Sequence, residues 1–189
     1  MAGLLCGFVL TSTRADDEAD FGPGHLLVSR VVYDSNPNNV VVGATLPPGC
    51  VSKCAKAVAD GTYPQVWNND SVDGSFGITS KIVLDQLTRS GHLISSLEVP
   101  NSSQRHIGPT SDQMVGSFSS KSEVALNLST DKRFVTFMGY LAPINALDVS
   151  NSNTPFVIDP TNPVPGQNYR VIAQVDRHGK FHFSQDQCV

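Results

Sequence analysis

The residues best suited to chemistry in this chain are two cysteines, Cys50 and Cys54, in the segment PPGCVSKCAKAVADG. Alanine and lysine favour a short helix after the two prolines, and Gly61 is suited to end it. One helical turn would place both sulfurs on one face, close enough to form a disulfide with some distortion. Free thiols are the alternative. A metal or redox site is a third interpretation, which would need further ligands or a C-x-x-C spacing.

Two acidic residues in NNDSVDG, Asp70 and Asp73, are candidate calcium ligands, because Ca²⁺ prefers carboxylate and loop carbonyl oxygens. Their spacing matches no calcium loop, and an Asx-rich turn is the simpler interpretation. His178 and His182 flank a predicted hairpin turn. Two metal-binding histidines at i and i+4 need a helix, so we predict no metal site there and no cofactor.

The sequence contains no recognisable catalytic motif. It has no G-x-S-x-G element for a serine nucleophile, and Gly22-Pro23-Gly24 lacks the following helix that a phosphate-binding loop requires. A binding or structural protein is therefore a better prediction than an enzyme.

Three N-x-[ST] sequences are candidate glycosylation sites in a eukaryotic secretory host. Asn69 and Asn101 lie in polar loops and are predicted to be accessible. Asn127 lies within a predicted strand, where we expect it to be inaccessible.

The composition excludes some partners. The chain has 189 residues, enough for one domain with a core or for a fragment of a larger one. Charged residues make up 16%, against about 25% in an average soluble protein. A net charge of -4 and the absence of any Lys/Arg run argue against binding to nucleic acid or an anionic membrane.

The first fifteen residues resemble the remnant of a signal peptide. The apolar run Ala2–Leu10 is too short to span a bilayer, which needs about 20 residues, and Thr13 and Ala15 suit cleavage before Asp16. A buried N-terminal strand or a disordered leader is the alternative. Residues 16–24 are predicted to be an acidic leader. The predicted location is secreted, extracellular or periplasmic, where a disulfide would persist.

Three β-hairpins are predicted, and together they indicate an all-β protein. The strongest is Ser122–Tyr140, with a polar turn at Ser129–Arg133, and the other two are Ile82–Val99 and Tyr169–Gln185. No long segment has a helical period. Polar or proline-rich loops are predicted over Pro100–Ser117 and Ala142–Gln167.

The strand RFVTFMGY is apolar on both faces. Phe134 and Met138 share one face, and Val135 and Phe137 share the other. Strands of this kind must be covered on both sides. We therefore predict that Phe134 and Phe137 are both core residues in sheets stacked around an axis, as in a β-propeller.

The segment NLSTDKRFVTFMGY resembles the repeat of β-propellers in secreted bacterial and quinoprotein-like proteins, where S-x-D-G-R-Phe/Tyr recurs. Lys132 stands at the usual glycine, and the Gly-His/Trp-Asp pattern of WD repeats is absent. The resemblance covers about a quarter of the chain. It implies that residues 25–189 form about two blades, at most three, of an incomplete propeller. In one register, each hairpin holds the same place in three successive blades. In the other, which we prefer because the middle hairpin is the most apolar, the outer two hairpins each close a blade and the middle one opens the second.

Such a resemblance implies a fold and no single function. We predict a secreted or cell-surface binding or structural module. Its loop face would take a protein or small-molecule ligand, and an open blade edge would allow self-association. The alternatives are a fragment of a secreted propeller enzyme, either a hydrolase or a quinoprotein-like oxidoreductase, and an inactive truncated product.

Overall fold

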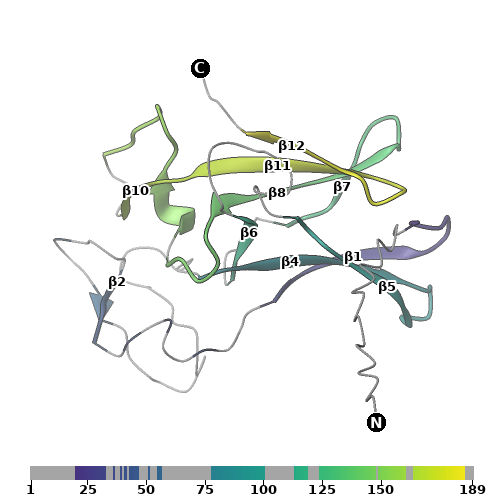
Figure 1. Cartoon of the computed structure of the whole chain (residues 1–189), viewed down its shortest axis with the longest axis horizontal. Helices are drawn as coiled ribbons and strands as arrows, with labels where there is room; N and C mark the ends of the chain where they lie inside the picture. Colours follow the sequence, from purple (N-terminus) through teal and green to yellow (C-terminus); the bar gives the residue numbers. More distant parts are fainter. Residues whose placement is uncertain are drawn as a thin grey trace, which may run out of the picture.

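The chain folds mostly into antiparallel β-sheet, which confirms the all-β prediction (Figure 1). A computed structural model describes residues 20–32, 36, 39, 41, 43–46, 51, 55–56, 78–100, 113–118, 124–147, 149–160 and 164–185. Helical structure in these ranges is confined to short 3-10 turns such as η2 (Val149–Asn151). None of the helices described is long and apolar enough to cross a membrane.

Eight of the described strands form the main sheet. Six follow one another in the order β1-β4-β6-β8-β11-β12, while β5 pairs with β4 and β7 pairs with β8. Their bounds are β1 (Leu26–Val32), β4 (Ile78–Leu87), β5 (Leu93–Glu98), β6 (Gln113–Phe118), β7 (Asn127–Leu128), β8 (Phe134–Ala142), β11 (Tyr169–Asp176) and β12 (Phe181–Gln185). Two small sheets pair β2 (Thr45–Leu46) with β3 (Ala55–Lys56) and β9 (Ser152–Asn153) with β10 (Val164–Gln167).

All three predicted hairpins are present, as β4–β5, β7–β8 and β11–β12. They belong to two antiparallel meanders. Unit 1 is β1-β4-β5, and unit 2 is β7-β8-β11-β12, with β6 pairing the far end of β8. The start of β4 pairs with β6 and joins the two units. In Figure 1 unit 2 lies above unit 1. The strands described form no closed sheet.

The two units repeat each other at a spacing of 88 residues. Val83, Gln86, Arg89 and Gly91 recur as Val171, Gln174, Arg177 and Gly179. The two turns also share a backbone hydrogen bond. The Gly91 N–H donates to the Thr88 carbonyl oxygen at 3.0 Å, and the Gly179 N–H donates to the Asp176 carbonyl oxygen at 3.0 Å. Both glycines have positive φ, 86° and 74°, which suits a residue without Cβ. The turns of β4–β5 and β11–β12 are therefore structurally equivalent, although the β4–β5 ladder has an irregularity between Gln86 and Leu87 that β11–β12 lacks.

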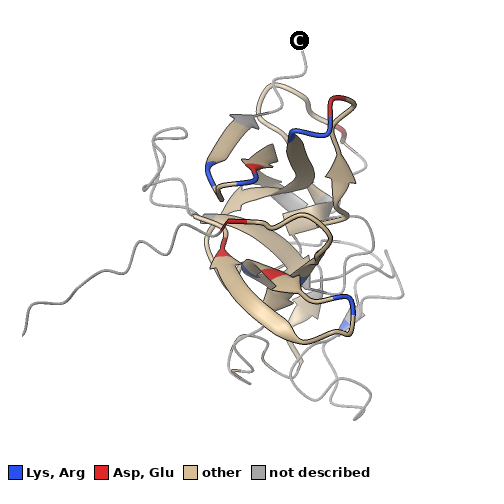
Figure 2. Cartoon of the chain, turned by 90° about the vertical axis from the view of Figure 1, so that its right-hand side faces the viewer, with Lys and Arg blue, Asp and Glu red and all other residues tan. Residues whose placement is uncertain are grey.

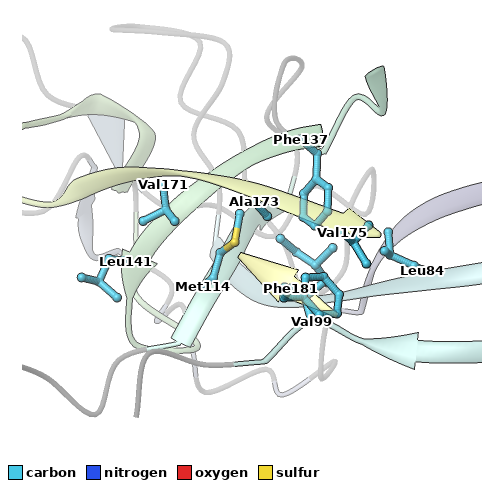
Figure 3. Packing of buried hydrophobic residues seen from close by; sticks show 10 residues of the cluster. Leu84, Val99, Met114, Phe137, Leu141, Val171, Ala173, Val175 and Phe181 are labelled. Atoms are coloured by element: carbon cyan, nitrogen blue, oxygen red, sulfur yellow. The ribbon is translucent and has the colours of Figure 1, made fainter. Parts of the chain in front are cut away.

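The core lies between the two units, where one face of each meander packs on the other (Figure 3). Burying each of the larger apolar side chains in this core contributes about 1.5–3 kcal/mol. The cluster consists of Ile82, Leu84, Val99, Met114, Phe137, Leu141, Val171, Ala173, Val175 and Phe181. Gly139 lets β6 approach β8 closely, because a Cβ there would lie 2.6 Å from the carbonyl oxygen of Val115.

Three local predictions are corrected. The proline-rich loop expected over Ala142–Gln167 instead contains the parallel pair β9–β10, and Pro165 lies within β10. The short helix expected around Cys50 and Cys54 is wrong at Ala55 and Lys56, which form β3. Antiparallel pairing with β2, supported by a 2.9 Å hydrogen bond from Lys56 Nζ to Thr45 Oγ1, overrides the helix propensity of alanine and lysine. The polar loop expected up to residue 117 instead contains β6.

The prediction that both faces of β8 are covered is confirmed for one face only. Phe137 is only 1% exposed, as predicted. Phe134 is half-buried at the turn end of the strand, and Met138, on the same face, is 49% exposed. The described strands pack on the Phe137 face, and this part of the opposite face is open.

Candidate functional site

Three hairpin turns, 88–92, 129–133 and 176–180, lie at the right-hand end of the molecule in Figure 1. We call this the turn end. The segment Asp20–His25 runs across it. The Phe21 N–H donates to the Arg177 carbonyl at 2.6 Å, and Arg89 Nε donates to the Gly24 carbonyl at 3.0 Å. This segment therefore connects the turns of the two units.

A hollow of about 320 Å³ lies between two of these turns. We call it the turn-end hollow. Figure 2 looks onto this end of the molecule and shows the charged residues at its turns. The turn before β8 and the turn before β12 each contribute three lining residues: Lys132, Arg133 and Phe134 from the first, and Asp176, Arg177 and His178 from the second.

The first turn is held by its own side chains. Ser129 Oγ accepts hydrogen bonds from the N–H groups of Arg133 and Phe134, at 3.2 and 3.0 Å. The Asp131 carboxylate accepts from Ser129 Oγ at 2.6 Å and from the Arg133 N–H at 3.2 Å. These bonds, that from Ser129 first, lower the pKa of Asp131. Asp131 is thus engaged within the turn.

Lys132 occupies the position in this turn that glycine usually takes. Its φ is 60°, in the left-handed region that L-residues enter at a cost of about 1–2 kcal/mol. Non-glycine residues in strained conformations are found disproportionately at functional sites. Because this position is a lysine and not a glycine, it adds a second cation next to Arg133 in the lining of the hollow.

The second turn holds its acidic residue in the same manner. The Asp176 carboxylate accepts from the N–H groups of His178 and Lys180, at 2.9 and 3.0 Å. Burial alone raises the pKa of Asp176, but these backbone bonds outweigh burial, and the pKa lies below its ordinary value. Among the described residues, Asp176 is the one carboxylate that lines the hollow, and it is ionised and already bound to backbone donors.

Three cations and an aromatic ring remain to face a ligand. Lys132, Arg133 and Arg177 line the hollow, with the Arg133 guanidinium 5.6 Å from the centre of the Phe134 ring. Arg177 Nε donates to His178 Nε2 at 2.9 Å, which requires the imidazole proton on Nδ1. The guanidinium nitrogens not used in that bond suit a carboxylate, sulfate or phosphate group.

Most of the site residues predicted from the sequence do not line the turn-end hollow. Cys50, Cys54, Asp70, Asp73, Asn69 and Asn101 lie outside the described residues. Asn127, expected to be inaccessible, is exposed on β7. Within the described part of the chain, no three His, Cys, Asp or Glu residues are grouped to hold a metal ion.

His178 and His182 do not act as a pair. His178 contacts Arg177 in the hollow, while the His182 ring forms a T-shaped pair with Phe134, their ring centres 6.5 Å apart. Sequence reasoning did not identify the hollow. The available signal was the basic residue in each predicted turn, but only the tertiary structure places two of those turns side by side.

Comparison with known proteins finds no protein family, no curated protein and no solved structure that matches this chain.

Proposed function

We propose that this chain is a secreted or cell-surface binding module whose turn-end hollow binds the anionic group of a small ligand. The observation that carries the proposal is the imbalance of available charge. Lys132, Arg133 and Arg177 line the hollow, and the Asp176 carboxylate beside them is already bound to two backbone N–H groups. An anion entering the hollow would find cationic donors.

The size and charge of the molecule favour a small ligand over a polymer. A hollow of about 320 Å³ is at the lower end for small-molecule sites. A net charge of -4 opposes the long-range attraction that a nucleic acid would need. We therefore expect a carboxylate or sulfate group on a compact body, such as an acidic sugar, to be bound.

We further propose that the two units are consecutive blades of an incomplete propeller. Two features support this. Each unit is an antiparallel meander that ends in an equivalent hairpin, β4–β5 in one and β11–β12 in the other. The β7–β8 hairpin also opens the second meander, which agrees with the preferred of the two registers. In such an arrangement the hollow would lie on one end of the blades, where loops and turns gather.

The test is calorimetric titration with a sulfated disaccharide and with its unsulfated analogue. We expect binding of the sulfated sugar only. Arg177→Gln should weaken it about tenfold or more, since a hydrogen bond to a charged group contributes about 1.5–3 kcal/mol.

Arg89→Gln is the matched control, because Arg89 holds the equivalent place in unit 1 and donates to the Gly24 carbonyl. Its affinity for the sulfated sugar should stay within about twofold of the parent. Equal binding of both sugars, no binding of either, or unchanged affinity in Arg177→Gln would refute the proposal.

A further inference from the structure

The 88-residue repeat gives each unit two comparable faces. In β4, Ile82, Leu84 and Gln86 form what we call face a of unit 1, and all three are buried. Their equivalents in β11 form face a of unit 2: Arg170, Ile172 and Gln174. The intervening residues of each strand form face b: Val83, Asp85 and Leu87 in unit 1, and Val171, Ala173 and Val175 in unit 2.

The contact between the units inside the chain is head-to-tail. Face a of unit 1, with Ile82 and Leu84, packs in the same core as face b of unit 2, with Val171, Ala173 and Val175. Two different faces meet, so the contact is heterologous. Face a of unit 2 and face b of unit 1 are consequently left on the outside of the pair.

Face a of unit 2 is exposed and apolar at its centre. Met138 and Ile172 lie opposite each other in the β8–β11 ladder and are 49% and 37% exposed. A shallow hollow of about 210 Å³ lies on this face, lined by Ala125, Asn127, Thr136, Phe137, Met138 and Ile172. None of the described strands covers this hollow, while β9 covers the other end of the face, where Arg170 Nη2 donates to the Ser152 carbonyl oxygen.

Face b of unit 1 has the apolar residues and the neutralised charges that a contact needs. Leu26 and Val28 of β1 share this face with Asp85 and are 49% and 43% exposed. Its charges are paired within the face. The Arg30 guanidinium binds Asp85, and Lys81 Nζ lies 2.9 Å from Glu98 Oε1. Covering the face would therefore leave no unpaired charge among these four.

We propose that face a of unit 2 is covered by face b of unit 1 from a second copy of this chain. The argument is continuity with the contact inside the chain. Face a of one unit already packs on face b of the next, and the two outer faces are the repeat equivalents of those two surfaces. A head-to-tail contact closes into a ring or extends as a filament. The proposal does not depend on what the turn-end hollow binds.

The test is light scattering and sedimentation of the parent chain at concentrations up to ~200 µM. We expect the mass to rise with concentration above that of one chain. Met138→Glu, on face a of unit 2, and Val28→Glu, on face b of unit 1, should each be monomeric. Val41→Glu is the control, because Val41 is 66% exposed and lies outside both units. It should assemble like the parent.

Mixing the two monomeric variants gives the decisive result. Each variant retains the face that the other has lost, so a 1:1 mixture should form a heterodimer and no larger species. A contact between two identical faces would not be restored by mixing, and that result would overturn the proposal. A parent chain that is monomeric over the whole concentration range would also overturn it. Circular dichroism checks that each variant is folded.

Discussion

Gln86 and Gln174 occupy the same position in two equivalent hairpins, yet Gln86 is buried and Gln174 is exposed. Gln86 Nε2 lies 2.6 Å from His25 Nδ1, and its Oε1 accepts a hydrogen bond from Ser95 Oγ at 3.0 Å. Gln174 lies on the outer face of unit 2. Equivalent residues of the two units are therefore buried or exposed according to whether their face packs on the other unit or lies on the outside.

The difference gives a first prediction. Gln86→Ala should lower the free energy of unfolding by about 1–3 kcal/mol, because it empties a buried site and removes the two hydrogen bonds of Gln86, to His25 and Ser95. Gln174→Ala, at an exposed site, should change it by no more than about 0.5 kcal/mol. Urea denaturation of the two variants and the parent measures both values. Equal losses would show that the two positions do not differ as described.

Core packing gives a second prediction. Phe137→Ala should cost about 3–5 kcal/mol, the usual range for an emptied aromatic core site. Phe134→Ala should cost less, because Phe134 is half-buried and lies outside the cluster that contains Phe137. Thermal and urea denaturation of both variants provide the comparison. Similar losses would mean that both faces of β8 are covered, as the sequence alone suggested.

The hairpins could be predicted from sequence because they depend on local patterns. Apolar runs separated by short turns with Ser, Asp or Gly and a basic residue occur at all three, and Lys132 was recognised as replacing a glycine. The strand β6 was missed. Its residues, 113–118, are few and lie between polar segments, and they pair with β4 and β8, which are distant in sequence.

Exposure and site geometry could not be predicted in the same way. The apolar side chain of Met138 suggests a buried face, but burial also requires another part of the structure to pack on that face. Met138 lies on the outer face of the pair of units and is exposed. The turn-end hollow combines Lys132 and Arg133 with Arg177, more than forty residues later in the chain. Nothing in a local pattern indicates that those two turns are neighbours.

The backbone of Lys132 gives a third prediction. Lys132→Gly removes the cost of a positive φ, about 1–2 kcal/mol, although the freer unfolded chain takes back about 0.4–1 kcal/mol. The variant should therefore be slightly more stable than the parent. Lys132→Gln keeps the strained backbone and removes the same charge, so its stability should not rise.

Both variants should bind the sulfated disaccharide more weakly, since each lacks the Lys132 ammonium group at the hollow. Calorimetric titration and melting temperatures separate the two effects. If Lys132→Gly is less stable than Lys132→Gln, the left-handed conformation is not a source of strain. If both bind the sugar like the parent, Lys132 is not part of the site.

Acid stability gives the fourth prediction. The pKa of Asp176 is lower in the folded protein than its ordinary value, so the folded state binds a proton less readily than the unfolded state. Its stabilising contribution is present above the ordinary pKa of about 3.9 and is lost as the pH falls through the folded value. Asp176→Asn keeps a side-chain oxygen to accept from the His178 and Lys180 N–H groups, but it cannot titrate. The parent should be the more stable of the two at pH 7.

The stability difference between the parent and Asp176→Asn should shrink as the pH is lowered from about 5 to 3, because only the parent loses this contribution. Both proteins will still lose some stability in acid. The pKa of Asp85 is lowered chiefly by its hydrogen bond from Arg30, and that carboxylate is present in both. Urea denaturation at a series of pH values measures the difference directly. A difference that stays constant across this range would mean that protonation of Asp176 is not linked to folding.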